Sequence, residues 1–142
     1  EEKSLGAIAK SGSTPITGVL SYAQPAPAAG LYAMDAPAYS PESLSGFVAA
    51  GAQLLLFSTG VGNSYVSALA PTIKLSANPA AAARLHQQLD FDASGVFRGE
   101  RALDDAAQDL LALVIDIASG TLTWGEVLDE GDEVVSRIGE AL

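Results

Sequence analysis

The stretch LLLFSTGVGNSYVSALAPTIKLSANP, residues 54–79, decides the fold class. Its apolar run at 54–58 has the length of a strand, and a run without polar alternation is typical of a parallel strand covered on both faces. A second strand candidate follows at 72–77. Asn78 and Pro79 then supply a helix cap and a first helical residue. The stretch therefore predicts parallel strands connected through helices.

The rest of the chain repeats this alternation. Strands are expected at 16–23 and 31–37, and helices at 80–89 and 103–119. The 103–119 helix should end at Gly120, and its buried stripe should comprise Leu103, Ala106, Leu110, Leu111, Val114, Ile117 and Ala118. The fold class predicted is α/β, with an open, mostly parallel sheet and crossover helices in a Rossmann-like three-layer arrangement.

Capping signals mark two further helices. Ser40 before Pro41 predicts a helix start, with Leu44, Phe47, Val48 and Gly51 on the buried face. Thr123 with Glu126 three residues later predicts a capping box on a short final helix. The tail at 132–138 is expected to form a late strand or an extended arm.

Composition limits the classes of function. The chain has 142 residues, 49% of them hydrophobic and 17% charged, which is typical of one folded domain over residues 1–142. The net charge of -10 argues against nucleic-acid partners and against docking on an anionic membrane. The absence of cysteine excludes disulfides and thiolate metal sites. No basic region followed by an apolar stretch marks a signal peptide at the start.

The segment STGVGN, residues 58–63, is the first candidate binding site. Ligands of open α/β sheets bind beyond the carboxyl ends of the strands, where this segment lies. Gly60 and Gly62 allow close backbone approach, and Ser58, Thr59 and Asn63 offer short polar groups for a carboxylate or a polyol. The alternative is a tight turn stabilised by its own side chains, and both interpretations stay open. The glycine spacing does not match a dinucleotide or Walker loop.

Other positions also carry residue types suited to chemistry. Lys74 lies within a strand candidate, pointing either to a cleft or to a solvated face. Asp35 closes the second strand at its carboxyl end. Asp90 and Asp92 point the same way if extended, and so can hold a hard cation, although paired aspartates more often cap turns. His86 is the sole histidine, and we expect it to be exposed on a helix. The acidic run 129–133 is expected to be a solvated turn.

Several motifs together resemble the altronate/galactarate dehydratase family in its C-terminal part. They are EEKSLGAIAKSGSTPITGVLSYA, GLYAMDAPAYSPESLSGFVAAGAQLLLFSTGVGN, APTIKLSANP and LDFDASGVFRGE, in this order along the chain. The resemblance implies removal of water from a sugar acid to give a 2-keto-3-deoxy acid. It also implies a divalent metal (iron(II), manganese or magnesium) in the full-length enzyme and a cytoplasmic location.

The resemblance also implies a place for this segment within a longer protein. Family members carry further parts upstream, and the chain begins with Glu1 rather than methionine. We therefore expect a C-terminal domain whose partners are a small sugar acid and the upstream domains, with a homo-oligomer as a further possibility. Catalysis by the isolated segment is not expected.

Dehydration requires a base for the proton α to the carboxylate and a cation beside the resulting enolate. Within the resemblance, Lys3 and Lys74 are the catalytic candidates, and Ser58, Thr59, Gly60, Gly62, Asn63 and Asp35 the substrate-binding ones. The alternative is a non-catalytic or structural domain that binds a carboxylate or sugar acid. Val61 favours it, because the family pattern is close to T-T-G-R-G-[TN] and valine cannot clamp a carboxylate as arginine does.

Overall fold

A computed structural model describes residues 2–134, with side chains from residue 4 onward. The chain divides into two compact units, one of Glu1–Ala52 with Val134–Leu142, and one of Gln53–Glu133. We call them unit 1 and unit 2 and describe each by itself. Both combine helices with short parallel strands in open sheets, which confirms the predicted α/β class. A single domain over residues 1–142 stays a prediction.

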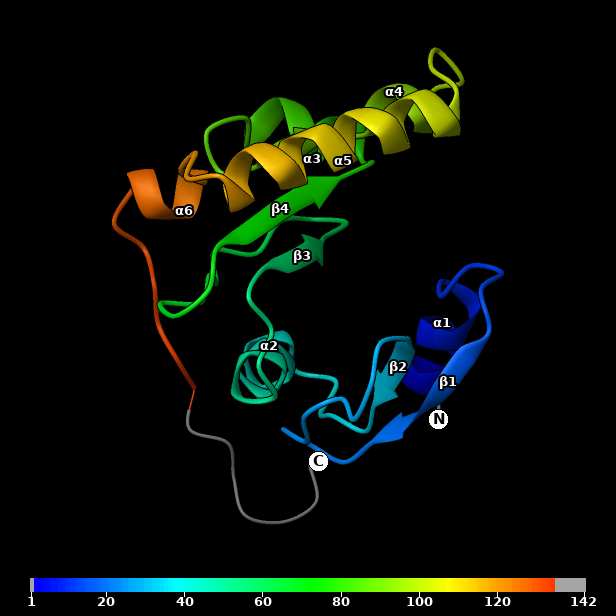
Figure 1. The fold of residues 1–142 in the computed structure, drawn as a ribbon. Helices are drawn as coiled ribbons and strands as arrows, with labels where there is room; N and C mark the ends of the chain where they lie inside the picture. Colours follow the sequence, from blue (N-terminus) through cyan, green and yellow to red (C-terminus); the bar gives the residue numbers. More distant parts are fainter. Residues whose placement is uncertain (1, 135–142) are drawn as a thin grey trace. The chain divides into compact units, whose positions relative to one another are not determined.

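Unit 1 contains a helix, a strand pair and a second helix. They are α1 (Glu2–Ala9), β1 (Ile16–Leu20), β2 (Leu31–Met34) and α2 (Ser40–Ala49). Figure 1 shows β1 and β2 side by side, and they pair in parallel from Ile16↔Leu31 to Leu20↔Met34. The hydroxyl of Tyr22 donates to the backbone carbonyl of Glu42 at 2.7 Å, which ties the segment after β1 to α2.

The start of α2 differs from the predicted cap by one residue. Tyr39 is the N-cap and makes no side-chain cap hydrogen bond, while Ser40 is already helical. The predicted buried face is also only partly correct, because Leu44 is buried whereas Phe47 is 37% exposed. For 132–138 we expect a late strand or an extended arm; residues 132–134 are not in a strand, and the remainder lies outside the described residues.

Unit 2 is built on three parallel strands in the order β3-β4-β5. They are β3 (Leu55–Ser58), β4 (Thr72–Ser76) and β5 (Phe91–Asp92). The central strand β4 is almost wholly buried. The run at 54–58, expected to be covered on both faces, instead forms the edge strand β3, in which Leu56 is 52% exposed.

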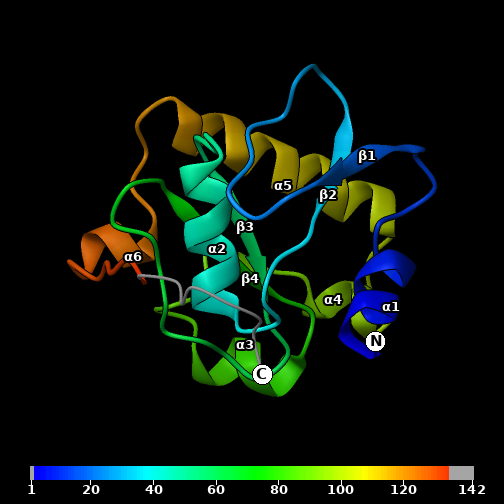
Figure 2. The same ribbon diagram turned by 90° about the horizontal axis from the view of Figure 1, so that it is seen from below.

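Helices flank this sheet. They are α3 (Pro79–Arg84), α4 (Ser94–Phe97), α5 (Leu103–Ala118) and α6 (Trp124–Val127). Figure 1 shows α3, α4 and α5 above β4, and Figure 2, seen from below, shows α3 and α5 on opposite sides of it. A helix interrupts the connection from β4 to β5, whereas loops connect β1 to β2 and β3 to β4.

The core of unit 2 is made of small and aliphatic side chains, and its buried apolar residues include Leu55, Val66, Ala70, Ile73, Ala81, Ala82, Leu89, Ala106 and Ile117. Ala106 and Ile117 confirm part of the stripe predicted for α5. The predicted burial of Leu103 and Leu111 is wrong, since their side chains are 70% and 59% exposed. Ala118 is exposed as well. Within the described residues, none of the helices combines the length and the apolar character that crossing a bilayer requires.

Local capping signals are the best-predicted features. Asn78 caps α3 by accepting a hydrogen bond from the amide of Ala80, and the capping box of Thr123 and Glu126 is complete. Gly120, with φ of +109°, follows the C-cap of α5 as predicted. Helix α3 ends at Arg84 rather than at residue 89, because Leu85 leaves the helical conformation with φ of −114°.

The double role of Asn78 gives a stability prediction. Its Oδ1 caps α3, while its Nδ2 donates to the carbonyl of Gly60 at 2.7 Å. Asn78→Ala loses both bonds, so we expect a loss of about 1–2 kcal/mol in unfolding free energy, measured by urea denaturation. Asn78→Asp keeps the cap acceptor and should lose less; equal losses in the two variants would contradict the assignment.

Candidate functional site

The loop after β3, residues 58–63, continues the sheet for one residue and then turns. The amide of Thr59 donates to the carbonyl of Leu75 at 2.9 Å. The amide of Gly62 donates to Thr59 Oγ1 at 3.0 Å, and the amide of Tyr65 donates to Asn63 Oδ1 at 2.9 Å. The acceptor oxygens of Thr59 and Asn63 therefore stabilise the turn itself, as the structural alternative for this segment requires.

Helix α3 holds this loop in place. Besides the Asn78 bond to Gly60, Arg84 Nη2 donates to the carbonyl of Val61 at 2.8 Å. Gly62 has φ of +101°, and a Cβ there would lie 2.2 Å from Leu85 Cδ1. Only glycine satisfies both the conformation and the close approach. Residues 60–62 of the loop are thus held by the cap residue Asn78 and the last residue Arg84 of α3, and by Leu85 after it.

An open cleft of about 410 Å³ lies beside this loop, lined by Ser58, Thr59, Gly60, Ala77, Asn78, Pro79 and Phe97. It occupies the carboxyl ends of β3 and β4, the edge at which open parallel sheets bind ligands. The volume is within the range of small-molecule sites. The hydroxyl of Ser58 makes no hydrogen bond within the described residues, so it is free to bind a ligand. Phe97, 74% exposed, adds an apolar wall from α4.

The cleft includes only part of the predicted substrate-binding set. Ser58, Thr59 and Gly60 line it, whereas Gly62 and Asn63 belong to the same loop but are not among the lining residues. Asp35 is exposed and lies in unit 1, where its amide donates to the carbonyl of Leu20. Ala77, Asn78, Pro79 and Phe97 are additions that the sequence analysis did not select. The sequence held a signal for Asn78 and Pro79, since a helix cap that directly follows a parallel strand lies at the carboxyl edge of the sheet, where the cleft is.

Lys74 lies inside unit 2 rather than in the cleft. Its side chain is 1% exposed, and its Nζ lies 3.6 Å from Glu130 Oε2. It is not a lysine on a solvated face. Glu130 was assigned to a solvated acidic turn, but its side chain is only 32% exposed and it pairs with a buried cation. Lys3 lies in α1, and its side chain is outside the described part of the chain.

Asp90 has a structural role in the sheet. Its Oδ2 accepts from the amide of Lys74 at 2.7 Å, and its Oδ1 accepts from the amide of Trp124 at 2.7 Å. Both oxygens therefore accept backbone amides, from residues 16 and 34 positions away in the chain, which is a structural role other than the local turn cap expected from the sequence.

Asp92 accepts from the amide of Ser94 at 2.8 Å through Oδ1. A side-chain hydrogen bond from Ser94 lowers the pKa of Asp92, and the Ser94 amide and Arg98 add to this effect against the opposing desolvation. These contacts place Asp92 at the end of β5, where the chain turns into α4. Among the described residues, no group of three or more His, Asp or Glu side chains is arranged to hold a metal ion.

The lowered pKa of Asp92 predicts a pH-dependent stability. A carboxyl with a lower pKa in the folded than in the unfolded state stabilises the fold above its ordinary value of 3.8, and this contribution is lost as the pH falls through the folded value. Asp92→Asn keeps the Oδ1 acceptor but not the charge. We expect it to melt below the wild type at pH 7, with the gap closing below pH 3.8 in a thermal unfolding series. A gap that is constant with pH would contradict this cause.

Comparison with known proteins places these features in a family. The model of "D-galactarate/Altronate dehydratase, C-terminal" matches residues 1–141. The chain is 35% identical over 142 residues to the (2R)-sulfolactate sulfo-lyase subunit beta of Chromohalobacter salexigens, a match that covers 99% of this chain and 36% of that protein. It is 31% identical over 142 residues to the altronate dehydratase of Escherichia coli, covering 100% of this chain and 28% of that one.

A third relative is the galactarate dehydratase (L-threo-forming) of Escherichia coli, 34% identical over 119 residues, with 84% of this chain and 23% of that protein covered. The chain thus spans 36% or less of the length of these relatives. The family match over nearly every residue confirms the resemblance found in the motifs. The chain belongs to the D-galactarate/altronate dehydratase C-terminal family.

Proposed function

We propose that this chain forms part of a lyase that removes water from a sugar acid to give a 2-keto-3-deoxy acid, and that it supplies part of the substrate site. The observation that carries the proposal is the cleft at the ends of β3 and β4, whose loop belongs to one of the motifs shared with the family. Relatives named altronate and galactarate dehydratase support a sugar acid as the ligand.

The cleft has suitable groups for a polyhydroxy acid. Ser58 offers a free hydroxyl, and Thr59 retains its hydroxyl proton as a donor because its oxygen acts as an acceptor in the turn. One N–H of the Asn78 amide is bound to Gly60, which leaves the other for a ligand oxygen. Neutral donors of this kind bind hydroxyl groups and carboxylate oxygens alike. The residues thus orient a polyol without strong charge of their own.

Asp90 and Asp92, the metal candidates from the sequence, take part in structural hydrogen bonds. Both oxygens of Asp90 accept backbone amides, and Asp92 is held by Ser94 and Arg98. We therefore derive no step through a metal from these residues. A divalent metal in the whole enzyme stays a prediction, as do the catalytic roles of Lys3 and Lys74.

A second candidate differs in the leaving group. The sulfo-lyase relative is named for (2R)-sulfolactate, which like altronate and galactarate is a 2-hydroxy acid. Eliminations from such acids share the removal of the proton α to the carboxylate, whereas the group lost from the next carbon is either hydroxide or sulfite. The carboxylate and its 2-hydroxyl are then the features that a common site must recognise.

The other alternative is a domain that binds an acid without chemistry. Val61 favours it, since its side chain is 73% exposed and provides no cation next to Gly60 of the cleft. Measuring the binding of the sugar acid and the release of a 2-keto acid separates these possibilities. If the intact protein binds the sugar acid and releases a 2-keto acid, the lyase is supported. If it binds the sugar acid but releases no 2-keto acid, the non-catalytic domain is supported.

The role of Ser58 gives a binding prediction. Isothermal titration calorimetry with galactarate, altronate and sulfolactate should detect binding of at least one acid to the chain. Ser58→Ala removes one ligand hydrogen bond and should weaken that binding about fivefold. Ser119→Ala is the matched control, because Ser119 is exposed and bonds only within α5 to the carbonyl of Ile115. Unchanged affinity in Ser58→Ala would place the ligand outside the cleft.

Restoring the family arginine gives a further prediction. Val61→Arg adds a guanidinium beside Gly60, and an exposed pair with a carboxylate should tighten binding of the acid up to about fivefold. Galactitol, which lacks carboxylates, should show no gain. Val127→Arg, at an exposed position on α6, controls for net charge. An equal effect in both variants, or on galactitol, would contradict a carboxylate next to residue 61.

A further inference from the structure

Two polar atoms inside unit 2 lack hydrogen bonds. Lys74 Nζ and Glu130 Oε2 are the buried side-chain atoms without a hydrogen-bond partner among the described residues, and they face each other at 3.6 Å. An ammonium group has three N–H donors, and leaving them unsatisfied in a buried position is costly. Such a pair in an otherwise ordered interior requires an explanation.

The other fully buried polar side chains of unit 2 are satisfied. Thr72, Ser76, Ser94 and Thr123 are 0–1% exposed, and each takes part in a hydrogen bond. Lys74 is therefore an exception to a rule that its neighbours follow. Because strand residues alternate, Thr72 and Ser76 share its face of β4. The unsatisfied amine is not the result of a loosely built interior.

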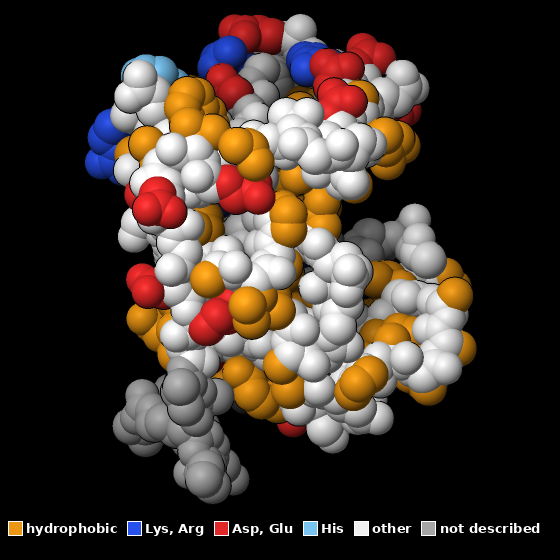
Figure 3. All heavy atoms as spheres, turned by 60° about the vertical axis from the view of Figure 1, so that its left-hand side comes forward, with side chains coloured by type: hydrophobic (Ala, Val, Ile, Leu, Met, Phe, Trp, Pro, Cys, Tyr) orange, Lys and Arg blue, Asp and Glu red, His pale blue; other side chains and the backbone are white. Residues whose placement is uncertain are grey.

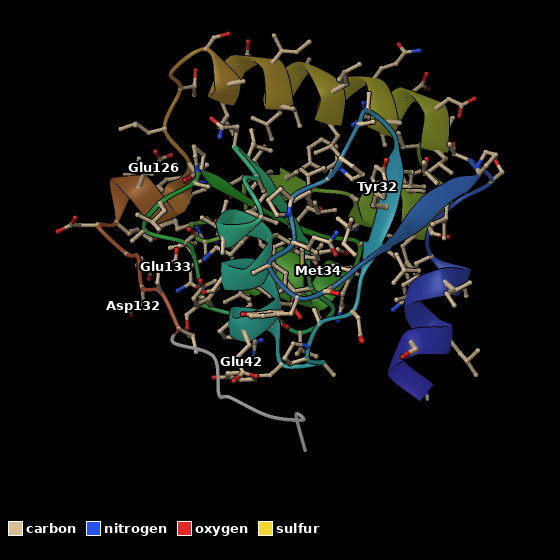
Figure 4. The ribbon with its side chains drawn as sticks, turned by 60° about the horizontal axis from the view of Figure 1, so that its bottom comes forward. Tyr32, Met34, Glu42, Glu126, Asp132 and Glu133 are labelled. Carbon is tan, nitrogen blue, oxygen red and sulfur yellow. The ribbon has the colours of Figure 1, made fainter. Side chains whose placement is uncertain are left out.

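Glu130 belongs to a segment held chiefly by polar contacts. We call residues 128–133 the strap; it follows α6, and Figure 4 shows Asp132 and Glu133 along it. The amide of Glu130 donates to the carbonyl of Gly125 at 2.9 Å, and that of Asp132 to the carbonyl of Val66 at 3.2 Å. Asp129 has φ of +55°, an uncommon conformation for a residue with a side chain.

Glu133 holds the C-terminal end of the strap through hydrogen bonds. Its carboxylate accepts hydrogen bonds from the hydroxyl of Ser67, from the amide of Ala68 at 3.2 Å and from the hydroxyl of Tyr65 at 3.2 Å. The strap residues other than Glu130 are exposed, so little apolar burial adds to these bonds. Segments held in this way open at a lower free energy than the core does.

The arginines near the cleft already have partners. Among the described residues of unit 2, Arg84 donates to the carbonyl of Val61, Arg98 pairs with Glu100, and Arg101 pairs with Asp109. Figure 3 shows acidic side chains beside basic ones over α3, α4 and α5. Since the chain carries a net charge of -10, an anionic ligand needs a local cation. Lys74 is a cation whose hydrogen-bonding capacity is unused.

We propose that the strap is a removable cover over Lys74, that Glu130 is the partner of its amine in the closed state, and that a ligand carboxylate takes the place of Glu130 when the strap lifts. The identity of the ligand rests on the proposed function, whereas the cover does not. Lys74 is then a second recognition point for the acid, separate from the cleft described above.

Amine labelling tests the cover. The chain has three lysines, Lys3, Lys10 and Lys74, so short pulses of N-hydroxysuccinimidyl acetate followed by peptide mass spectrometry report each of them. Lys10 is exposed and serves as the internal reference. In the wild type we expect Lys74 to react at least about tenfold more slowly than Lys10. Glu133→Ala removes the fastening and should speed labelling of Lys74 about tenfold, with Lys10 unchanged.

Glu100→Ala is the matched control, because it removes an exposed carboxylate of the same unit that does not contact the strap. Circular dichroism and urea unfolding show whether each variant keeps its fold. Wild-type labelling of Lys74 at the rate of Lys10 overturns the cover. Equal labelling of Lys74 in the wild type and in folded Glu133→Ala does so too.

The ligand is tested separately in Glu133→Ala. Galactarate should slow labelling of Lys74, and galactitol should not. If galactarate binds in calorimetry but leaves Lys74 labelling unchanged, the exchange with Glu130 is overturned while the proposed function stands. If galactarate does not bind at all, the sugar-acid proposal fails, and the response of Lys74 to Glu133→Ala still decides the cover.

Discussion

The fold of unit 2 depends on the hydrogen bonds of Asp90. Strand β4 is buried and central, so each of its backbone amides needs an acceptor. Strand β5 is only two residues long and starts at Phe91, which leaves the amide of Lys74 without a backbone partner on that side. Asp90 Oδ2 takes this amide, and the amide of Asp90 returns a bond to the carbonyl of Lys74 at 2.8 Å. A side chain here completes the ladder of a sheet.

The same carboxylate connects the sheet to the C-terminal part of the unit. Asp90 Oδ1 accepts from the amide of Trp124, the first residue of α6, next to the capping box of Thr123 and Glu126. The position of α6 in turn sets where the strap begins. The placement of Glu130 against Lys74 thus follows from one aspartate that bonds to the strand carrying that lysine.

The sequence revealed the parts of this structure that neighbouring residues determine. The Asn78 cap, the Thr123–Glu126 box and the end of α5 at Gly120 each involve groups within about one helical turn, so the chemistry is readable from order alone. The shared edge of β3 and β4 was equally readable, because parallel strands place their carboxyl ends together.

The parts that failed depend on partners distant in the chain. Asp90 is either a metal ligand or a turn cap in the linear pattern, and its bonds to the amides of Lys74 and Trp124, 16 and 34 residues away, give it a structural use that neither interpretation named. Glu130 looks like one member of a solvated acidic run until Lys74 is found beside it. Burial of Leu56 and Phe47 was overestimated for a similar reason, because hydrophobicity indicates the tendency to be covered but not which strand is central.

The geometry of β4 also explains why one strand can serve two recognition points. Lys74 precedes Ala77 of the cleft by three residues, roughly 10 Å along a strand. Its amine is directed to Glu130, whereas the cleft is formed by backbone and side chains at the end of the strand. A buried ammonium with an incomplete set of acceptors is destabilising where it serves only the fold, since an apolar residue of similar volume would avoid the desolvation. The desolvation cost of Lys74 has a reason if its amine binds a ligand that the folded chain alone does not contain. Because the strap is short and held by polar contacts, its opening would let such a ligand reach the amine.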